Sequence, residues 1–292
     1  MLAIALDRVL DIPKSIAKEK KVYILPIPVY IDGKMYLDGV DITSEEFYRK
    51  FHPGVVLKTS APSLKVIEEF YERIKSDGYD ELLFFHVSPE LTSVPNAIKL
   101  VASQIKGLKV HFFDTRQISI GGGFAVMRAI KLLEKGKSVK EIIDILKDFS
   151  KNVCVRFTVF NLEYLIKGGR LTKIEGLIGA LLKIKPILGI DKTGSIIPFH
   201  KARSTKLVMK KMTDDIVEHL RNRRRNNILA IGWGHSRMKE YALELKAILE
   251  KKLSDFLEEV PEFIHIYLPP VLACHSGPEL FGCAAYGEPL SE

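Results

Sequence analysis

Short apolar runs alternate with amphipathic segments along the first 150 residues of the chain. Three of the apolar runs have the character of buried strands: 2–6 (LAIAL), 81–87 (ELLFFHV) and 108–113 (LKVHFF). The intervening segments 64–77, 94–105 and 120–135 carry apolar residues at helical spacing. This alternation predicts a mainly parallel sheet with helices on its faces.

The pattern changes after about Lys151. Two apolar runs, 186–190 and 195–200, flank the turn Lys192–Gly194 and predict a hairpin, hence antiparallel pairing. Further strands are predicted at 227–232 and 263–268, with a last short one at 271–273, and long helices at 205–220 and 238–253. The predicted fold class is therefore α/β in two domains. Residues 1–150 form an N-terminal domain with a mainly parallel sheet and flanking helices, and residues 151–292 form a C-terminal α/β domain with a mixed sheet.

Turn and cap signals locate several boundaries within the first domain. Segment 22–31 resembles a strand, but Pro26 and Pro28 confine it to a sheet edge or to an extended segment. Asp32-Gly33 is a hairpin turn signal. Residues 43–46 (TSEE) form a capping box that starts a short helix, and 58–63 (KTSAPS) reads as a loop rich in hydroxyl groups.

Composition excludes several classes of protein. The 292 residues carry a formal charge of +8, but the basic clusters lack interleaved aromatic residues, so nucleic-acid binding is not expected. Lys183 and Lys185 interrupt the longest apolar run, so no integral membrane segment is expected. The first residues lack the features of a signal peptide, which makes the cytoplasm the expected location. The three cysteines and scattered histidines show neither disulfide nor metal-ligand spacing, so no metal is expected.

The stretch from Asn161 to Gly194 combines a polar turn with a long apolar run. The turn is Lys167-Gly168-Gly169-Arg170, and the run begins at Gly176. Two glycines allow close backbone approach, and the guanidinium of Arg170 suits a carboxylate or a phosphate. An anion-binding turn beside an apolar surface favours a ligand with an acidic head and an apolar tail. The alternative is a tight turn leading into a core helix.

Hydroxyl groups gather where ligands usually bind in such folds, beyond the carboxyl ends of strands. Thr59 and Ser60 could donate to a carboxylate, or they could cap the next helix. Thr92 and Ser93 precede a helix, where free N–H groups attract anions, although they could be ordinary N-caps. His275 lies in a predicted loop with Ser276. Because GxSxG, P-loop and HExxH patterns are absent, no catalytic group is assigned.

Taken in order along nearly the whole chain, these segments resemble the DegV family of bacterial fatty-acid-binding proteins. Among the most specific are EYLIKGGR and LKIKP; the matching stretches are 7–13, 24–43, 58–63, 88–97, 114–123, 163–170, 182–186, 201–203 and 275–282.

The resemblance implies two α/β domains that hold one long-chain fatty acid between them, with its tail in a tunnel. The bound fatty acid would be the only ligand, with no cofactor. Hydroxyls of Thr59, Ser60, Thr92 and Ser93 would bind its carboxylate near His275. In some members a separate fatty-acid kinase phosphorylates the bound acyl group, and Arg170 and Arg203 match positions associated with the phosphate or with this partner. The protein itself would be a carrier and not an enzyme.

The sequence departs from the family pattern around the expected head-group site. Arg8 and Val9 replace the Ser-Thr of the first family motif, D-S-T-x-D-L-P, and Ser93 and Val94 replace a Gly-Thr. Two alternatives therefore remain. The chain could be an enzyme acting on an acyl or phosphorylated small molecule with His275 as acid or base. It could also be an interaction module that uses its basic surface.

Overall fold

The computed structural model describes residues 1–171 and 184–290, and the chain divides into two compact units. Unit 1 comprises Met1–Ser150 and Pro269–Val271, and unit 2 comprises Lys151–Leu268 and Leu272–Glu292. The short segment Pro269–Val271 thus packs with unit 1, although it lies within the predicted C-terminal domain. The described helices and strands form an α/β fold, as predicted.

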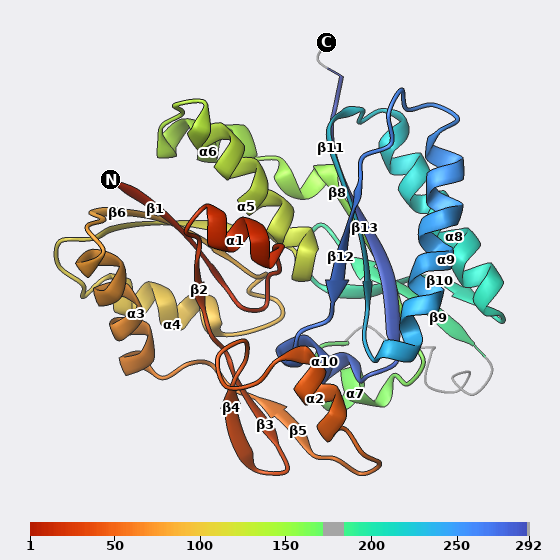
Figure 1. Ribbon diagram of the computed structural model, residues 1–292, viewed down its shortest axis with the longest axis horizontal. Coiled ribbons are helices and arrows are strands. Elements are labelled where there is room, and N and C mark those ends of the chain that lie inside the picture. Colours follow the sequence, from red (N-terminus) through yellow and green to blue (C-terminus); the bar gives the residue numbers. More distant parts are fainter. Residues whose placement is uncertain (172–183, 291–292) are drawn as a thin grey trace. The chain divides into compact units, whose positions relative to one another are not determined.

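Unit 1 is built on a parallel sheet in the order β2-β1-β6-β7 (Figure 1). The four strands are β1 (Leu2–Asp7), β2 (Tyr23–Leu25), β6 (Glu81–His86) and β7 (Lys109–Asp114). Burial along β6 is nearly continuous, as expected for a parallel strand covered on both faces. The accompanying helices are α1 (Lys14–Glu19), α3 (Leu64–Ser76), α4 (Val94–Ala102), α5 (Ser119–Glu134) and α6 (Val139–Leu146).

A second, antiparallel sheet of unit 1 has the order β4-β3-β5, with β3 (Pro28–Ile31), β4 (Lys34–Leu37) and β5 (Leu57–Thr59). Asp32 and Gly33 both have positive φ, as the predicted hairpin turn requires. Thr43 and Glu46 form the predicted capping box at the start of α2 (Ser44–Lys50). The single extended segment predicted at 22–31 is wrong, because Pro26 separates β2 from β3. The loop predicted at 58–63 begins too early, because Thr59 still pairs with Val29.

Unit 2 contains a mixed sheet in the order β10-β9-β8-β13-β11-β12, in which only β11 and β12 are parallel among the described strands. The strands are β8 (Val153–Val159), β9 (Lys185–Ile190), β10 (Ile196–Ala202), β11 (Arg225–Trp233), β12 (Phe263–Tyr267) and β13 (Leu280–Glu288). The helical elements are α7 (Glu163–Lys167), α8 (Thr205–Arg221), η2 (Ser236–Met238) and α9 (Lys239–Leu253). Two further elements have residues in both units: η1 (Phe149–Asn152) belongs to unit 2 from Lys151 onward, and α10 (Pro270–Ser276) from Leu272 onward. The predicted hairpin of β9 and β10 is confirmed.

Near the C-terminus one prediction is wrong and one strand was missed. The strand predicted at 271–273 is the start of α10, so His275 lies in the last turn of a helix and not in a loop. The strand β13 was not predicted at all, yet it pairs with both β8 and β11 near the middle of the sheet.

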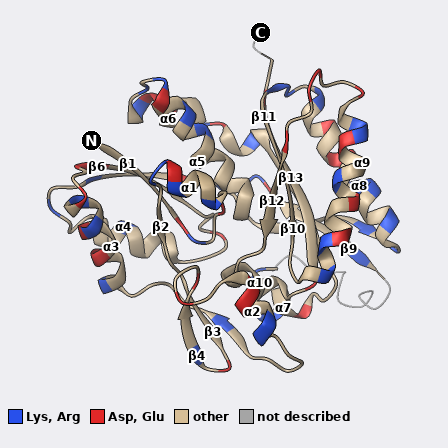
Figure 2. Cartoon of the chain, viewed as in Figure 1, with Lys and Arg blue, Asp and Glu red and all other residues tan. Residues whose placement is uncertain are grey.

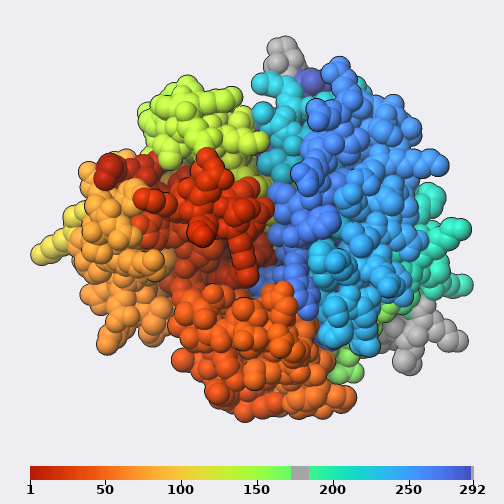
Figure 3. Space-filling view, viewed as in Figure 1, coloured from red at the N-terminus to blue at the C-terminus, as the bar shows by residue number. Residues whose placement is uncertain are grey.

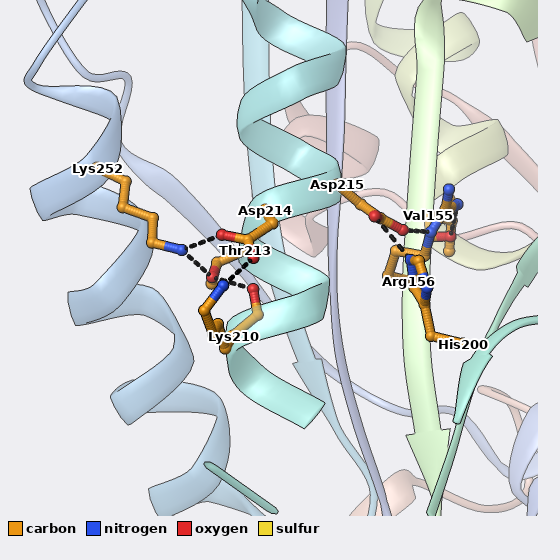
Figure 4. A network of polar contacts seen from close by, with 8 residues as sticks. All are labelled: Val155, Arg156, His200, Lys210, Thr213, Asp214, Asp215 and Lys252. Carbon is orange, nitrogen blue, oxygen red and sulfur yellow. Dashed lines mark hydrogen bonds and ion pairs between the residues drawn. The ribbon is translucent and has the colours of Figure 1, made fainter. Parts of the chain in front are cut away.

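Helices α8 and α9 cover the core of unit 2 with apolar faces and expose charged ones, visible as blue and red bands in Figure 2. The buried side of α8 includes Val208, Met212 and Ile216. Asp215 of α8 pairs with the guanidinium of Arg156 on β8 and lies 2.9 Å from Nε2 of His200 on β10 (Figure 4). These polar contacts tie α8 to two strands of the sheet, β8 and β10.

Candidate functional site

The glycine turn after α7 packs against the end of α10 within unit 2. A Cβ atom placed on Gly168 would lie 2.7 Å from Nδ1 of His275 and 2.9 Å from the carbonyl oxygen of Tyr164. Gly169 has a φ of +69°, which few residues other than glycine adopt readily. The two glycines therefore let the backbone turn tightly and lie directly against the imidazole.

A second glycine, Gly277, makes a close contact in the same region, where the turn after α7 meets the end of α10. Gly277 has a φ of +73°, and a Cβ atom there would lie 2.5 Å from the ring of Tyr164. The motifs EYLIKGGR and HSGP, far apart in the sequence, are thus in contact through Tyr164, Gly168, His275 and Gly277. Sequence reasoning missed Tyr164 and Gly277, although both belong to the motifs that it singled out.

Burial controls the charges of this Arg170–His275 cluster. Burial lowers the pKa of His275 to about 4, and the nearby guanidinium of Arg170 lowers that pKa further. Burial also lowers the pKa of Arg170, whose Nη1 donates to the carbonyl oxygen of Gly168. At neutral pH the pair is therefore a neutral imidazole beside a half-buried cation. Such a pair suits an anion, because Arg170 supplies the charge and an imidazole N–H supplies a hydrogen bond.

The predicted hydroxyl groups all lie in unit 1. Thr59 ends β5, and Oγ of the exposed Ser60 lies 3.4 Å from the hydroxyl of Tyr30. Thr92 accepts a hydrogen bond from the backbone N–H of Val94 at 3.3 Å, at the start of α4. Ser93 is the N-cap residue of α4, but its side chain makes no capping hydrogen bond. Thr92 and Ser93 thus stand at a helix N-terminus, as the sequence suggested.

Arg203 is exposed and lies between β10 and α8 in unit 2. The next residue, Ser204, caps α8 by accepting from the backbone N–H of Leu207 at 3.3 Å. The start of the apolar run at Gly176 lies outside the described residues. Within residues 1–171 and 184–290, no group of three or more His, Cys, Asp or Glu side chains is placed to hold a metal ion. In that same part of the chain, no helix is long and apolar enough to cross a membrane.

Comparison with known proteins decides the family. The family model described as "Uncharacterised protein, DegV family COG1307" matches residues 1–288. The chain belongs to the DegV family. A DegV domain-containing protein of Clostridium acetobutylicum is 32% identical over 288 residues, covering 96% of this chain and 97% of the relative. One from Staphylococcus aureus is 30% identical over 279 residues, covering 96% of each chain.

Solved DegV structures share the fold throughout. A DegV family protein from Thermus thermophilus, described as binding fatty acid, has a TM-score of 0.88 at 28% identity, covering 98% of this chain and 99% of its own. A fatty-acid-binding DegV protein from Streptococcus agalactiae has a TM-score of 0.85 at 27% identity, covering 99% of each chain. A stearic-acid-binding protein from Eubacterium ventriosum also has a TM-score of 0.85, at 25% identity and 99% coverage of each chain.

In this DegV protein, Arg8 of the altered first motif has a structural role. Its guanidinium pairs with Asp11 at 3.0 Å and with Asp38 at 3.1 Å, and all three side chains are largely buried. Asp38 also accepts a hydrogen bond from the backbone N–H of Val271 at 2.8 Å, near the start of α10. Arg8 therefore pairs with two buried carboxylates of unit 1. Sequence reasoning missed Asp38, because only the folded chain brings it to Arg8.

Asp7, at the end of β1, is a buried carboxylic acid whose pKa lies close to neutral pH. Burial raises the pKa of Asp7 from 3.8 to about 7. Hydrogen bonds from the backbone N–H groups of Val87 and Val9 lower the pKa, but their effect is smaller than that of burial. Since the folded pKa exceeds the unfolded one, folded Asp7 retains a proton that the unfolded chain releases. This stabilisation is complete below the unfolded pKa and is lost as pH rises through about 7.

We expect this DegV protein to lose about 2 kcal/mol of unfolding free energy between about pH 5 and pH 7 through Asp7. The variant Asp7→Asn should flatten that slope, as measured by urea unfolding at several pH values. Asp80→Asn is the control, because Asp80 is exposed and its pKa is lowered by the N-terminal amino group. An unchanged slope in Asp7→Asn would show that Asp7 is already ionised in the folded state.

Proposed function

We propose that this protein binds one long-chain fatty acid and does not itself change it chemically, acting as a carrier and not as an enzyme. The observation that carries the proposal is the Arg170–His275 cluster, a half-buried cation beside a neutral imidazole, in a chain whose relatives include fatty-acid-binding proteins. Thr59, Ser60, Thr92 and Ser93 are proposed as further donors to the carboxylate. The tunnel between two domains that the family resemblance implies is part of the proposal and rests on the family alone.

The energetics are compatible with a carrier. A tail of ~15 methylene groups gains about 12 kcal/mol on leaving water, at roughly 0.8 kcal/mol for each group. Ordering the chain and losing its free motion offset much of this gain. The head group then needs only enough donors to avoid an unpaired buried charge. No cofactor enters the proposal.

Native mass spectrometry of protein purified without detergent tests the proposal. The expected result is an added mass in the range of long-chain fatty acids, and exchange with added palmitate or oleate. A protein that is always empty and takes up neither lipid would refute the proposal. Hydrolase and phosphotransfer assays on acyl esters and acyl phosphates, with His275→Ala as control, test the alternative in which His275 is a catalytic acid or base.

We expect Thr59→Val to weaken fatty-acid binding about fivefold to tenfold, because an isosteric side chain removes one donor to the carboxylate. Binding is measured by displacement of a fluorescent fatty acid, with circular dichroism to establish that the fold is retained. Ser76→Ala is the control, since its hydroxyl bonds the carbonyl oxygen of Arg73 on the surface of α3. Unchanged affinity would place the head group elsewhere.

We further propose that the protein presents its bound fatty acid to a separate kinase. The kinase would transfer the γ-phosphoryl group of ATP to a carboxylate oxygen, giving an acyl phosphate and ADP. Arg170 is proposed to meet the phosphate, and the exposed Arg203 is proposed to face the kinase. Mixing the loaded protein with a bacterial fatty-acid kinase and ATP should release ADP in proportion to the bound lipid, and Arg203→Ala should slow that release.

A further inference from the structure

Unit 1 has a hollow that the proposed carrier function does not use. It has a volume of about 620 Å³ and lies at the start of β2, where α1 and α3 end. This is the amino end of the parallel sheet, whereas Thr92 and Ser93 follow the carboxyl end of β6. The red and orange segments that line the hollow adjoin one another on the surface of unit 1 in Figure 3. Its volume falls within the range of sites that hold small molecules.

One wall of the hollow is aromatic. The ring of Tyr23 packs edge to face against Phe70, at 6.4 Å between ring centroids, and against Tyr79 at 5.9 Å. The hydroxyl of Tyr23 donates to Asp77, the C-cap residue of α3. These contacts hold a half-buried aromatic cluster at the rim, where a planar group could pack against it.

The other lining residues are mostly cationic. Lys18, Lys21 and Arg73 line the hollow, and none of them forms an ion pair within the described part of the chain. By contrast, their neighbour Lys20 pairs with both Glu19 and Glu134 at 2.8 Å. Arg73 lies over the ring of Tyr23, 6.0 Å from its centroid. Three exposed cations thus line a concave surface that also includes Asp77, and none of the three is ion-paired with a carboxylate in the described part of the chain.

The helix ends do not cancel this charge. Cations are favoured at helix C-termini, where each helix contributes roughly −0.5 of a charge, and α1 and α3 both end here. Two such helix ends and the carboxylate of Asp77 together contribute a charge of about −2. The two lysines and the arginine contribute +3. The hollow therefore has a net positive charge, which a bound anion would neutralise.

We propose that this hollow binds a small aromatic anion of the nucleoside phosphate class. Its base would pack against Tyr23 and Tyr79, and its phosphate groups would be held by Lys18, Lys21 and Arg73. The cations supply the charge that a phosphate requires, and the aromatic wall supplies the contact that inorganic phosphate lacks. The site is independent of fatty-acid binding.

Isothermal titration calorimetry with ADP, without divalent cations, tests the site. We expect saturable binding with a dissociation constant below about 1 mM, weaker binding of adenosine and of inorganic phosphate, and a loss of affinity at high salt. The double variant Lys21→Gln/Arg73→Gln should weaken ADP binding at least about tenfold. The control Lys65→Gln/Lys131→Gln removes the same charge from exposed positions of α3 and α5 and should leave the affinity unchanged.

Each other outcome overturns the proposal. Absence of saturation with ADP, equal losses in the two double variants, or phosphate binding as tightly as ADP would each do so. Binding of an acidic peptide through Lys21 and Arg73, without binding of ADP, would assign the hollow to a protein partner instead. Fatty-acid content measured on the same samples should be equal in all variants, so failure here is separable from failure of the carrier function.

Discussion

Replacing Gly123 by alanine is expected to lower the unfolding free energy of unit 1 by about 3 kcal/mol or more. In most helices the same change stabilises by about 0.5–1 kcal/mol, because alanine has the higher helix propensity. Here the added Cβ atom would lie 1.7 Å from the carbonyl oxygen of Asp11. A backbone atom cannot rotate away as a side chain can, so α5 or the segment before α1 must move.

That movement would disturb more than one contact. Asp11 pairs with Arg8 and accepts a hydrogen bond from the hydroxyl of Ser119, at the start of α5, at 3.2 Å. The loss should appear as a lower midpoint in thermal or urea unfolding followed by circular dichroism. Gly122→Ala is the graded comparison, because its added Cβ atom meets a movable methyl group of Leu10 at 2.4 Å. A Gly123→Ala protein at least as stable as the parent would contradict the close approach of α5 to Asp11.

The sequence allowed the parallel half of the fold to be predicted because its signals are local. The buried strands β1 and β6 are short apolar runs, and helix α3 has its own start and stop signals, Ser63 before it and Gly78 after it. The hairpin of β9 and β10 likewise depends on a turn that can be recognised from a few residues. Local signals of this kind agree with the tertiary structure, so they predict it.

Strand β13 could not be recognised in the same way. Its central residues, Gly282 to Ala285, are small, so the run lacks the large β-branched residues that mark a strand. The small residues are required by neighbours: a Cβ atom on Gly282 would lie 2.6 Å from the carbonyl oxygen of Arg156 on β8. Helix α10 was mistaken for a strand because Val271 and Leu272 looked like a short apolar run, although Pro270 is a typical first helical residue.

The sequence allowed single residues of the candidate site to be selected, but not the contacts between them. Arg170 and His275 were selected from separate motifs, but only the folded chain brings the turn at Gly168 against the imidazole. Burial then determines their charges, and the sequence contains no direct signal for it. The neutral state of His275 at pH 7 therefore follows from the structure, and it makes Arg170 the charged member of the pair.

For that reason we expect Arg170→Gln to weaken fatty-acid binding by about 2 kcal/mol, or roughly thirtyfold. Glutamine retains a hydrogen-bond donor but not the charge that opposes a buried carboxylate. The same change should raise the pKa of His275, because the guanidinium lowers it, but the pKa should stay below 6.5, since burial is the larger cause. Affinity is measured by displacement of a fluorescent fatty acid, and the histidine pKa by NMR titration.

Lys167→Gln is the matched control for this variant. It removes a positive charge three residues before Arg170, but Lys167 is exposed and pairs with Glu163 at 3.1 Å on the surface of α7. Salt screens such exposed charges, so the control should change the affinity less than about twofold and leave the pKa of His275 in place. If Arg170→Gln raised that pKa and left the affinity unchanged, the cluster would have the described electrostatics without contacting the carboxylate. If neither quantity changed, the guanidinium would not lie beside the imidazole in solution, and the Arg170–His275 cluster would have to be rejected as the head-group site.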